Sequence, residues 1–134
     1  MKLVYSNFDK ETGISTVILQ NRNGRYIGTA RLHPEDKGSE IAGCSLAEKR
    51  AWINYYKSEI KRDKIKLKEI LSIKKDIIIN DSYYENPALI RINIRIKYLS
   101  NQIKTFTERL DKIQNYIDQS IKIRKNILDK LGQK

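Results

Sequence analysis

The first third of the chain alternates short apolar runs with turn residues. Three runs are rich in β-branched and aromatic residues: 3–8, 14–20 and 25–32. A short link containing Gly13 joins the first two, and Asn23-Gly24, which tolerates positive φ, separates the second from the third. Pro34 then ends the sheet, because proline cannot donate a ladder hydrogen bond. The pattern predicts a three-stranded antiparallel β-meander over residues 1–38, which needs a helix across one face to be stable in water.

A helical pattern follows the meander, and it has two alternative starts. Ser45 and Glu48 match the capping box S-x-x-E, whereas Ser39 is the N-cap of an earlier start. The earlier start places small and apolar side chains on one face, suited to close packing against the meander: Ile41, Cys44, Ala47 and Ala51. We favour this start, which predicts a first long helix over residues 39–79.

This first helix carries an apolar seam at heptad spacing. Its a and d positions hold Ile53, Tyr56, Ile60, Leu67, Ile70 and Ile77. Asp63 and Lys74 interrupt the seam with polar side chains.

Residues 88–132 predict a second, longer helix, although they open on "ALIRINIRIKYL" (88–99), which alternates like a strand. Eleven of the thirteen positions in a 3-4 series are apolar, the series being Leu89, Ile92, Ile96, Leu99, Ile103, Phe106, Leu110, Ile113, Ile117, Ser120, Arg124, Ile127 and Leu131. A strand, with its period of two, would scatter this series over both faces. Ile90 and Ile94 then form a flanking stripe beside the seam.

The connection over residues 80–87 is short, with Asn86 as the candidate N-cap and Pro87 at the first helical position. A link of this length favours an antiparallel helical hairpin, and the longer second helix is expected to return to the meander. The predicted fold is therefore α+β, with a β-meander followed by a coiled-coil-like hairpin in one domain. A homodimer that shares the seam is an open alternative, favoured by the additional Ile90 and Ile94 stripe.

Charge is distributed unevenly along the chain. The 134 residues carry a formal net charge of +11, yet residues 1–44 hold six basic against five acidic residues. A strongly basic balance points to an anionic partner. The single cysteine excludes an internal disulfide, and no apolar run reaches the ~20 residues of a membrane span, so we expect a cytoplasmic protein.

Candidate catalytic residues are sparse and lack positioned partners. His33 is the lone histidine and Cys44 the lone cysteine, so neither a zinc site nor a cysteine–histidine pair is expected. Glu35, Asp36 and Glu40 are interpreted as turn and capping residues. No phosphate-binding loop or hydrolase motif occurs. The sequence predicts no catalytic residue, metal or cofactor, and hence no enzyme.

The clearest functional signal is a row of cations on the first helix. Six basic residues recur at helical spacing away from the seam: Arg50, Lys57, Lys61, Lys64, Lys68 and Lys75. Such a row is suited to following a phosphate backbone, which suggests nucleic acid or a nucleoprotein as partner. A plain solvated face and an acidic protein surface are the alternatives. Arg25 and Arg31 on the third predicted strand give a weaker second signal.

The stretch "GTARLHPEDKGSEIAGCSLAEKRA" (28–51) resembles small phage- and prophage-encoded proteins of Gram-positive bacteria. These proteins share a G-T-A-x-L-H-P-E-D segment, a S-E-I-A-G-C helix start and a lysine-rich tail. The resemblance covers roughly the first half of the chain and defines no catalytic residues. It implies an accessory role in a bacterial host cell, including inhibition of host defences of the anti-CRISPR type, with a CRISPR effector as partner. A structural coiled-coil adaptor is the remaining interpretation.

Overall fold

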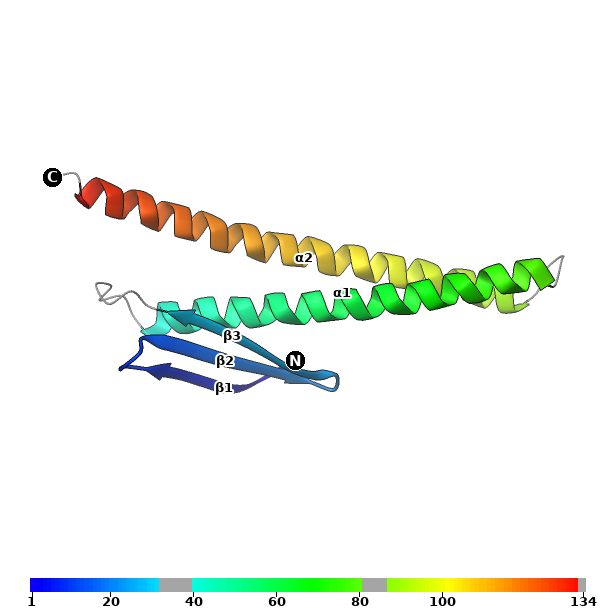
Figure 1. Ribbon diagram of the computed structural model, residues 1–134, viewed down its shortest axis with the longest axis horizontal. Helices are drawn as coiled ribbons and strands as arrows, with labels where there is room; N and C mark the ends of the chain where they lie inside the picture. Colours follow the sequence, from blue (N-terminus) through cyan, green and yellow to red (C-terminus); the bar gives the residue numbers. More distant parts are fainter. Residues whose placement is uncertain (32–39, 81–86, 133–134) are drawn as a thin grey trace. The chain divides into compact units, whose positions relative to one another are not determined.

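The computed structural model describes residues 1–31, 40–80 and 87–132, and its five elements follow one another in the order β1-β2-β3-α1-α2 (Figure 1). The strands are β1 (Lys2–Asp9), β2 (Ile14–Asn21) and β3 (Gly24–Arg31). The helices are α1 (Glu40–Asn80) and α2 (Pro87–Gly132). The predicted α+β fold, a β-meander followed by two long helices, is confirmed.

Two compact units divide this chain. The first contains Met1–Tyr55 and Leu110–Lys134, so it joins the sheet to the start of α1 and the end of α2. The second contains Tyr56–Arg109, which is the rest of the two helices. The units follow tertiary contacts, whereas the ranges predicted from the sequence follow secondary structure.

The sheet has strand order β1-β2-β3 with both pairs antiparallel. Between β2 and β3, Asn21 pairs with Gly24, so the two loop residues are Arg22 and Asn23, one position earlier than the predicted Asn23-Gly24 turn. The Asn21 side chain explains this placement, because its Oδ1 accepts a hydrogen bond from the Asn23 amide at 2.8 Å. Gly24 then opens β3 with a φ of +155°, which favours glycine.

The core of the first unit lies between the sheet and α1. Val17, Leu19 and Ala30 project from the inner face of the sheet, and all three are buried with Ala47 and Ala51 of α1. Leu46 and Trp52 pack against the edge of this cluster. Ala47 and Ala51, two members of the small face predicted for the first helix, thus meet the sheet. Cys44 of that face is half-buried, and the side chain of Ile41 lies outside the described residues. Helix α1 begins at Glu40, the earlier of the two alternative starts; its expected cap, Ser39, lies outside the described residues.

Gly28 sets how closely α1 approaches β3. A Cβ atom at this position would overlap the carbonyl oxygen of Ala47 and the amide nitrogen of Ala51. Both are backbone atoms, which cannot rotate away as the end of a side chain would. Only glycine on the strand, facing alanines on the helix, permits this spacing.

Two side chains of α1 cap the open edge of β3. Arg50 Nη1 donates a hydrogen bond to the Thr29 carbonyl at 2.8 Å, and Asn54 Nδ2 donates to the Ile27 carbonyl at 2.6 Å. The two donors are four residues apart on α1, which is about 6 Å, and the two acceptors are two residues apart on β3, which is about 6.6 Å. The spacing of the donors therefore matches the spacing of the acceptors. Edge carbonyls that would otherwise be available to another chain are therefore satisfied by the helix.

The helices run antiparallel within each unit. In the second unit, the Tyr56 and Phe106 rings lie 5.7 Å apart, and Leu99 is 1% exposed. In the first unit, residues near the start of α1 line a cavity together with residues near the end of α2, including Ser45 and Tyr116. Both the hairpin and the return of α2 to the compact unit that holds the sheet are confirmed.

The predicted seam is buried along most of its length. All six apolar seam positions of α1 and the nine series positions of α2 from Leu89 to Ile117 are buried or half-buried. Beyond Ile117 the prediction is wrong for the two described apolar positions, because Ile127 and Leu131 are exposed; Ser120, one of the two polar positions of the series, is exposed as well. Ile127 and Leu131 lie beyond the turn of α2 that lines a cavity with the start of α1, so α1 does not cover them.

The isoleucine alternation at the start of α2 splits between two faces. Ile92 and Ile96 are half-buried, whereas Ile90 and Ile94 are 56% and 64% exposed. Residues two positions apart on a helix point in nearly opposite directions, so one set faces α1 and the other faces solvent. Tyr98, one turn further, is also exposed. We call Ile90, Ile94 and Tyr98 the outer apolar face.

Candidate nucleic-acid interface

Five lysines of α1 form the main candidate surface. Lys57, Lys61, Lys64, Lys68 and Lys75 all belong to the second unit, and every one is exposed. We call these five residues the lysine row. With 3.6 residues per turn they fall on one narrow face of the helix, over a length of about 27 Å. That length equals roughly eight steps of 3.4 Å along one DNA strand.

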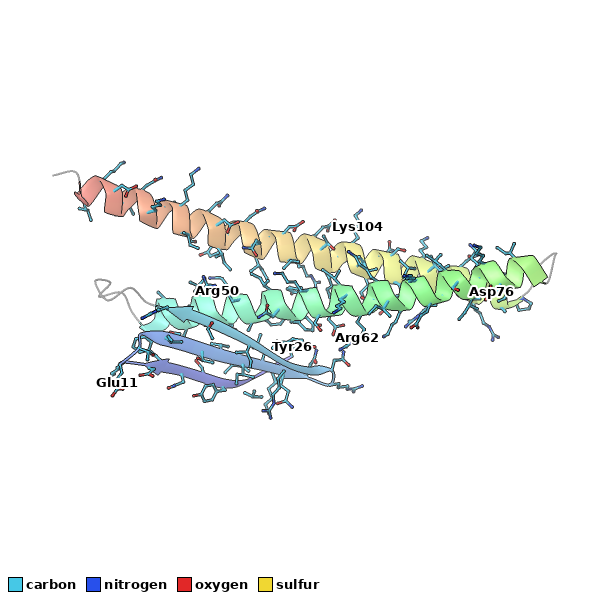
Figure 2. The ribbon with its side chains drawn as sticks, in the orientation of Figure 1. Glu11, Tyr26, Arg50, Arg62, Asp76 and Lys104 are labelled. Atoms are coloured by element: carbon cyan, nitrogen blue, oxygen red, sulfur yellow. The ribbon has the colours of Figure 1, made fainter. Side chains whose placement is uncertain are left out.

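The other predicted cations have different surroundings. Arg50, labelled in Figure 2, is half-buried and donates to the Thr29 carbonyl, so its side chain has a structural role at the edge of the sheet. Arg25 and Arg31 are exposed on the outer face of β3, six residues apart, and thus separated by about 20 Å of strand. The structure therefore groups the five lysines of the row on one helical face of the second unit, whereas Arg25 and Arg31 belong to the first unit.

Two acidic residues of α1 are turned away from the lysine row. Glu59 is buried and accepts a hydrogen bond from Arg62 at 3.1 Å, which forms an ion pair within the helix. Asp63, at the predicted interruption of the seam, is 3% exposed, and its Oδ2 atom has no hydrogen-bond partner. Neither carboxylate is positioned to neutralise the row.

The environment of Asp63 disfavours its charged form. Burial away from water is the largest influence, and it raises the pKa of Asp63 above the ordinary value of 3.8; the nearby Glu59 carboxylate raises it further. Lys66, Arg62 and Arg95 oppose the shift by favouring the carboxylate. The sequence marks Asp63 as a polar seam residue, but only packing shows that it lacks a full set of partners.

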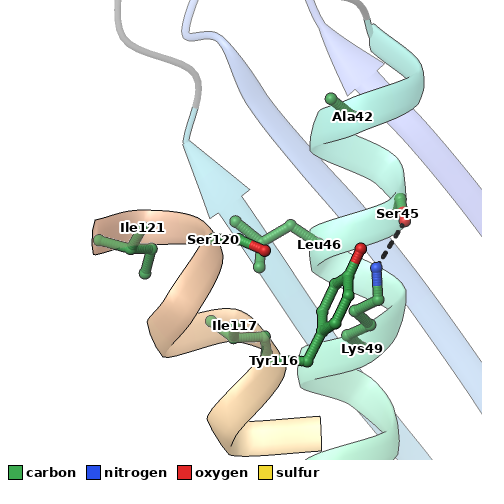
Figure 3. A pocket seen from close by; sticks show the side chains of 8 residues that line it. All are labelled: Ala42, Ser45, Leu46, Lys49, Tyr116, Ile117, Ser120 and Ile121. Carbon is green, nitrogen blue, oxygen red and sulfur yellow. Dashed lines mark hydrogen bonds between the residues drawn. The ribbon is translucent and has the colours of Figure 1, made fainter. Parts of the chain in front are cut away.

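A cavity in the first unit was missed by sequence reasoning. It has a volume of about 270 Å³ and lies where α2 passes the start of α1 (Figure 3), lined by Ala42, Ser45, Leu46, Lys49, Tyr116, Ile117, Ser120 and Ile121. The sequence does show that Ser45 and Lys49 stand one helical turn apart, on the same face of α1. Their pairing with α2 could not be read from the sequence, because it depends on how the hairpin is aligned.

Other candidate residues add no site among the described residues. Cys44 is a half-buried free thiol. His33, Glu35 and Asp36 lie outside the described residues. Within the ranges that the structure covers, no three histidine, cysteine or acidic side chains gather as a metal site would require. Neither α1 nor α2, over its described length, is apolar enough to cross a bilayer.

Comparison with known proteins finds no matching family model, no matching curated protein and no matching solved structure.

Proposed function

We propose that the protein is a non-enzymatic binding protein that engages the phosphate backbone of a nucleic acid, free or within a nucleoprotein, through the lysine row. The observation that carries this proposal is the exposure of five like-charged side chains on one helical face. Lysine ammonium groups contact phosphates as point charges and tolerate irregular spacing. Binding of this kind releases counterions and reads no bases, so we expect strong salt dependence and little sequence preference.

The test replaces four members of the row together, as Lys57→Gln, Lys61→Gln, Lys64→Gln and Lys68→Gln. Glutamine has nearly the helix propensity of lysine, so α1 is expected to stay folded. Fluorescence anisotropy with a labelled oligonucleotide, at several salt concentrations, gives the log–log salt slope. That slope should shrink by roughly 0.9 per lost contact for duplex DNA and about 0.7 for a single strand.

A matched variant separates a site from bulk charge. Four exposed lysines of α2 are replaced in the control: Lys97, Lys104, Lys112 and Lys122. Both variants lose the same formal charge, so a general electrostatic attraction would weaken equally in the two. Equal loss in both variants, or no binding by the wild type at low salt, would refute the lysine row as a phosphate site.

A second candidate function is direct binding of a protein effector, as an inhibitor of the anti-CRISPR type would do. The outer apolar face favours it, because exposed isoleucines at i and i+4 suit insertion into a groove on a partner. Residues 87–107 of α2 contain four basic and no acidic residues, so the fitting partner surface is acidic. This inhibitor would bind its effector after nuclease treatment, and substitution of Ile90 and Ile94 by serine would abolish binding. Neither nuclease treatment nor these two substitutions would change the binding of a coiled-coil adaptor.

A further inference from the structure

The cavity beside Lys49 combines apolar walls with one cation. Leu46 of α1 and Ile117 and Ile121 of α2 supply apolar surface, and Lys49 projects along the same space (Figure 3). The lysine ammonium is held at two points. Its Nζ donates to Ser45 Oγ at 3.2 Å and lies 4.4 Å from the centre of the Tyr116 ring.

Neither of those two contacts supplies a counterion for the charge of Lys49. The only ion pair among the described residues joins Arg62 to Glu59, so no described carboxylate lies within ion-pair distance of Lys49. An ammonium group has three donors, and one hydrogen bond to Ser45 and one ring contact do not use them all. The Lys49 side chain is half-buried, which makes an anionic partner more favourable there than at an open surface.

We propose that this cavity binds a small amphipathic carboxylate, with its anionic group on Lys49 and its apolar body against Leu46, Ile117 and Ile121. Cavity size sets the size of the ligand. Benzene, with six carbon atoms, fills an apolar cavity of about 150 Å³, so 270 Å³ holds roughly ten non-hydrogen atoms. Octanoate has that size and that chemistry.

The experiment is a titration of the full-length protein with sodium octanoate below its micelle concentration, followed by methyl NMR. We expect saturable shifts at the Ile117 and Ile121 methyl groups, with a dissociation constant on the order of 1 mM for so small a ligand. Octanol, which has the same chain without the charge, should bind roughly tenfold more weakly, and acetate should not bind.

Two variants test the roles of charge and volume. Lys49→Gln should weaken octanoate binding by roughly tenfold or more while leaving octanol unchanged, because it removes one charge-assisted hydrogen bond. Ser120→Leu should fill the cavity and abolish both. Lys104→Gln, an exposed lysine in the other unit, is the matched control and should change neither.

Several results would overturn the proposal. Equal affinity for octanoate and octanol would leave an apolar cavity with no anion selectivity. Shifts confined to methyl groups outside the cavity would place the ligand elsewhere. Unchanged octanoate binding in Ser120→Leu would also show that the ligand binds outside the cavity. This test does not depend on Lys49→Gln being stable enough to study.

Discussion

Replacement of Gly28 by alanine tests the docking of the sheet on α1. The added methyl group would occupy the same space as the Ala47 carbonyl oxygen and the Ala51 amide nitrogen. Since both are backbone atoms of a continuous helix, α1 must move away from β3. We therefore expect a loss of stability larger than that of an ordinary surface change.

The magnitude follows from what this movement breaks. Overpacking a filled core costs about 1–3 kcal/mol. A shifted helix also lengthens the hydrogen bonds from Arg50 to the Thr29 carbonyl and from Asn54 to the Ile27 carbonyl, which together are worth about 2–4 kcal/mol. Partial relaxation makes the terms less than additive, so we expect Gly28→Ala to lower the free energy of unfolding by about 3–5 kcal/mol.

Trp52 provides the assay, because it is the only tryptophan of the chain and packs against the core between sheet and helix. Urea unfolding followed by its fluorescence reports on the docking, and circular dichroism at 222 nm reports on the helices. Gly132→Ala is the control, since a methyl group there meets open space and should change stability by less than about 1 kcal/mol.

A second substitution distinguishes a backbone clash from a side-chain clash. Ala47→Gly removes the Ala47 methyl group but leaves its carbonyl oxygen in place, so it should not rescue Gly28→Ala. If the double variant recovers wild-type stability, or if Gly28→Ala is as stable as Gly132→Ala, the close approach of α1 to β3 is refuted.

Three further predictions concern the helices. Leu99→Ala, which opens a cavity at a fully buried seam position, should cost about 2–5 kcal/mol, whereas Lys68→Gln should cost under about 0.5 kcal/mol; similar costs in thermal unfolding would mean that the buried face is misassigned. Asp63→Asn should match the wild type below pH 3.8, where Asp63 is protonated in both the folded and the unfolded chain. Above that pH the wild type should be less stable than Asp63→Asn by on the order of 1 kcal/mol, because its raised pKa makes the folded state lose stability as pH rises through the folded pKa. Urea unfolding between pH 3.5 and 7 measures this difference in the free energy of unfolding. A wild type more stable than Asp63→Asn at pH 7 would contradict the prediction. Sedimentation should show self-association through Ile90 and Ile94 that strengthens with salt, because salt screens the repulsion between the cations of α2; a monomer at all protein and salt concentrations would exclude a dimer.

The sequence by itself determined the elements of the fold. Asn23 and Gly24 marked a hairpin because turns depend on a few neighbouring residues, and only the position of the turn moved by one. The 3-4 spacing from Leu89 onward identified α2 despite its strand-like opening, because a repeat over many turns outweighs a short alternation. The lysine row was also visible, since residues on one helical face are related by fixed spacing.

Tertiary structure alone decided how distant residues are used. Arg50 fits the spacing of the lysine row but caps the edge of β3, because α1 lies along that strand. Gly28 is not a turn residue; it is required by the backbone of a helix that follows much later in the chain. Lys49 faces Tyr116 only because the hairpin aligns the start of α1 with the end of α2. These pairings depend on the global packing of apolar surface, in which each partner is selected by the whole fold, and no local pattern encodes them.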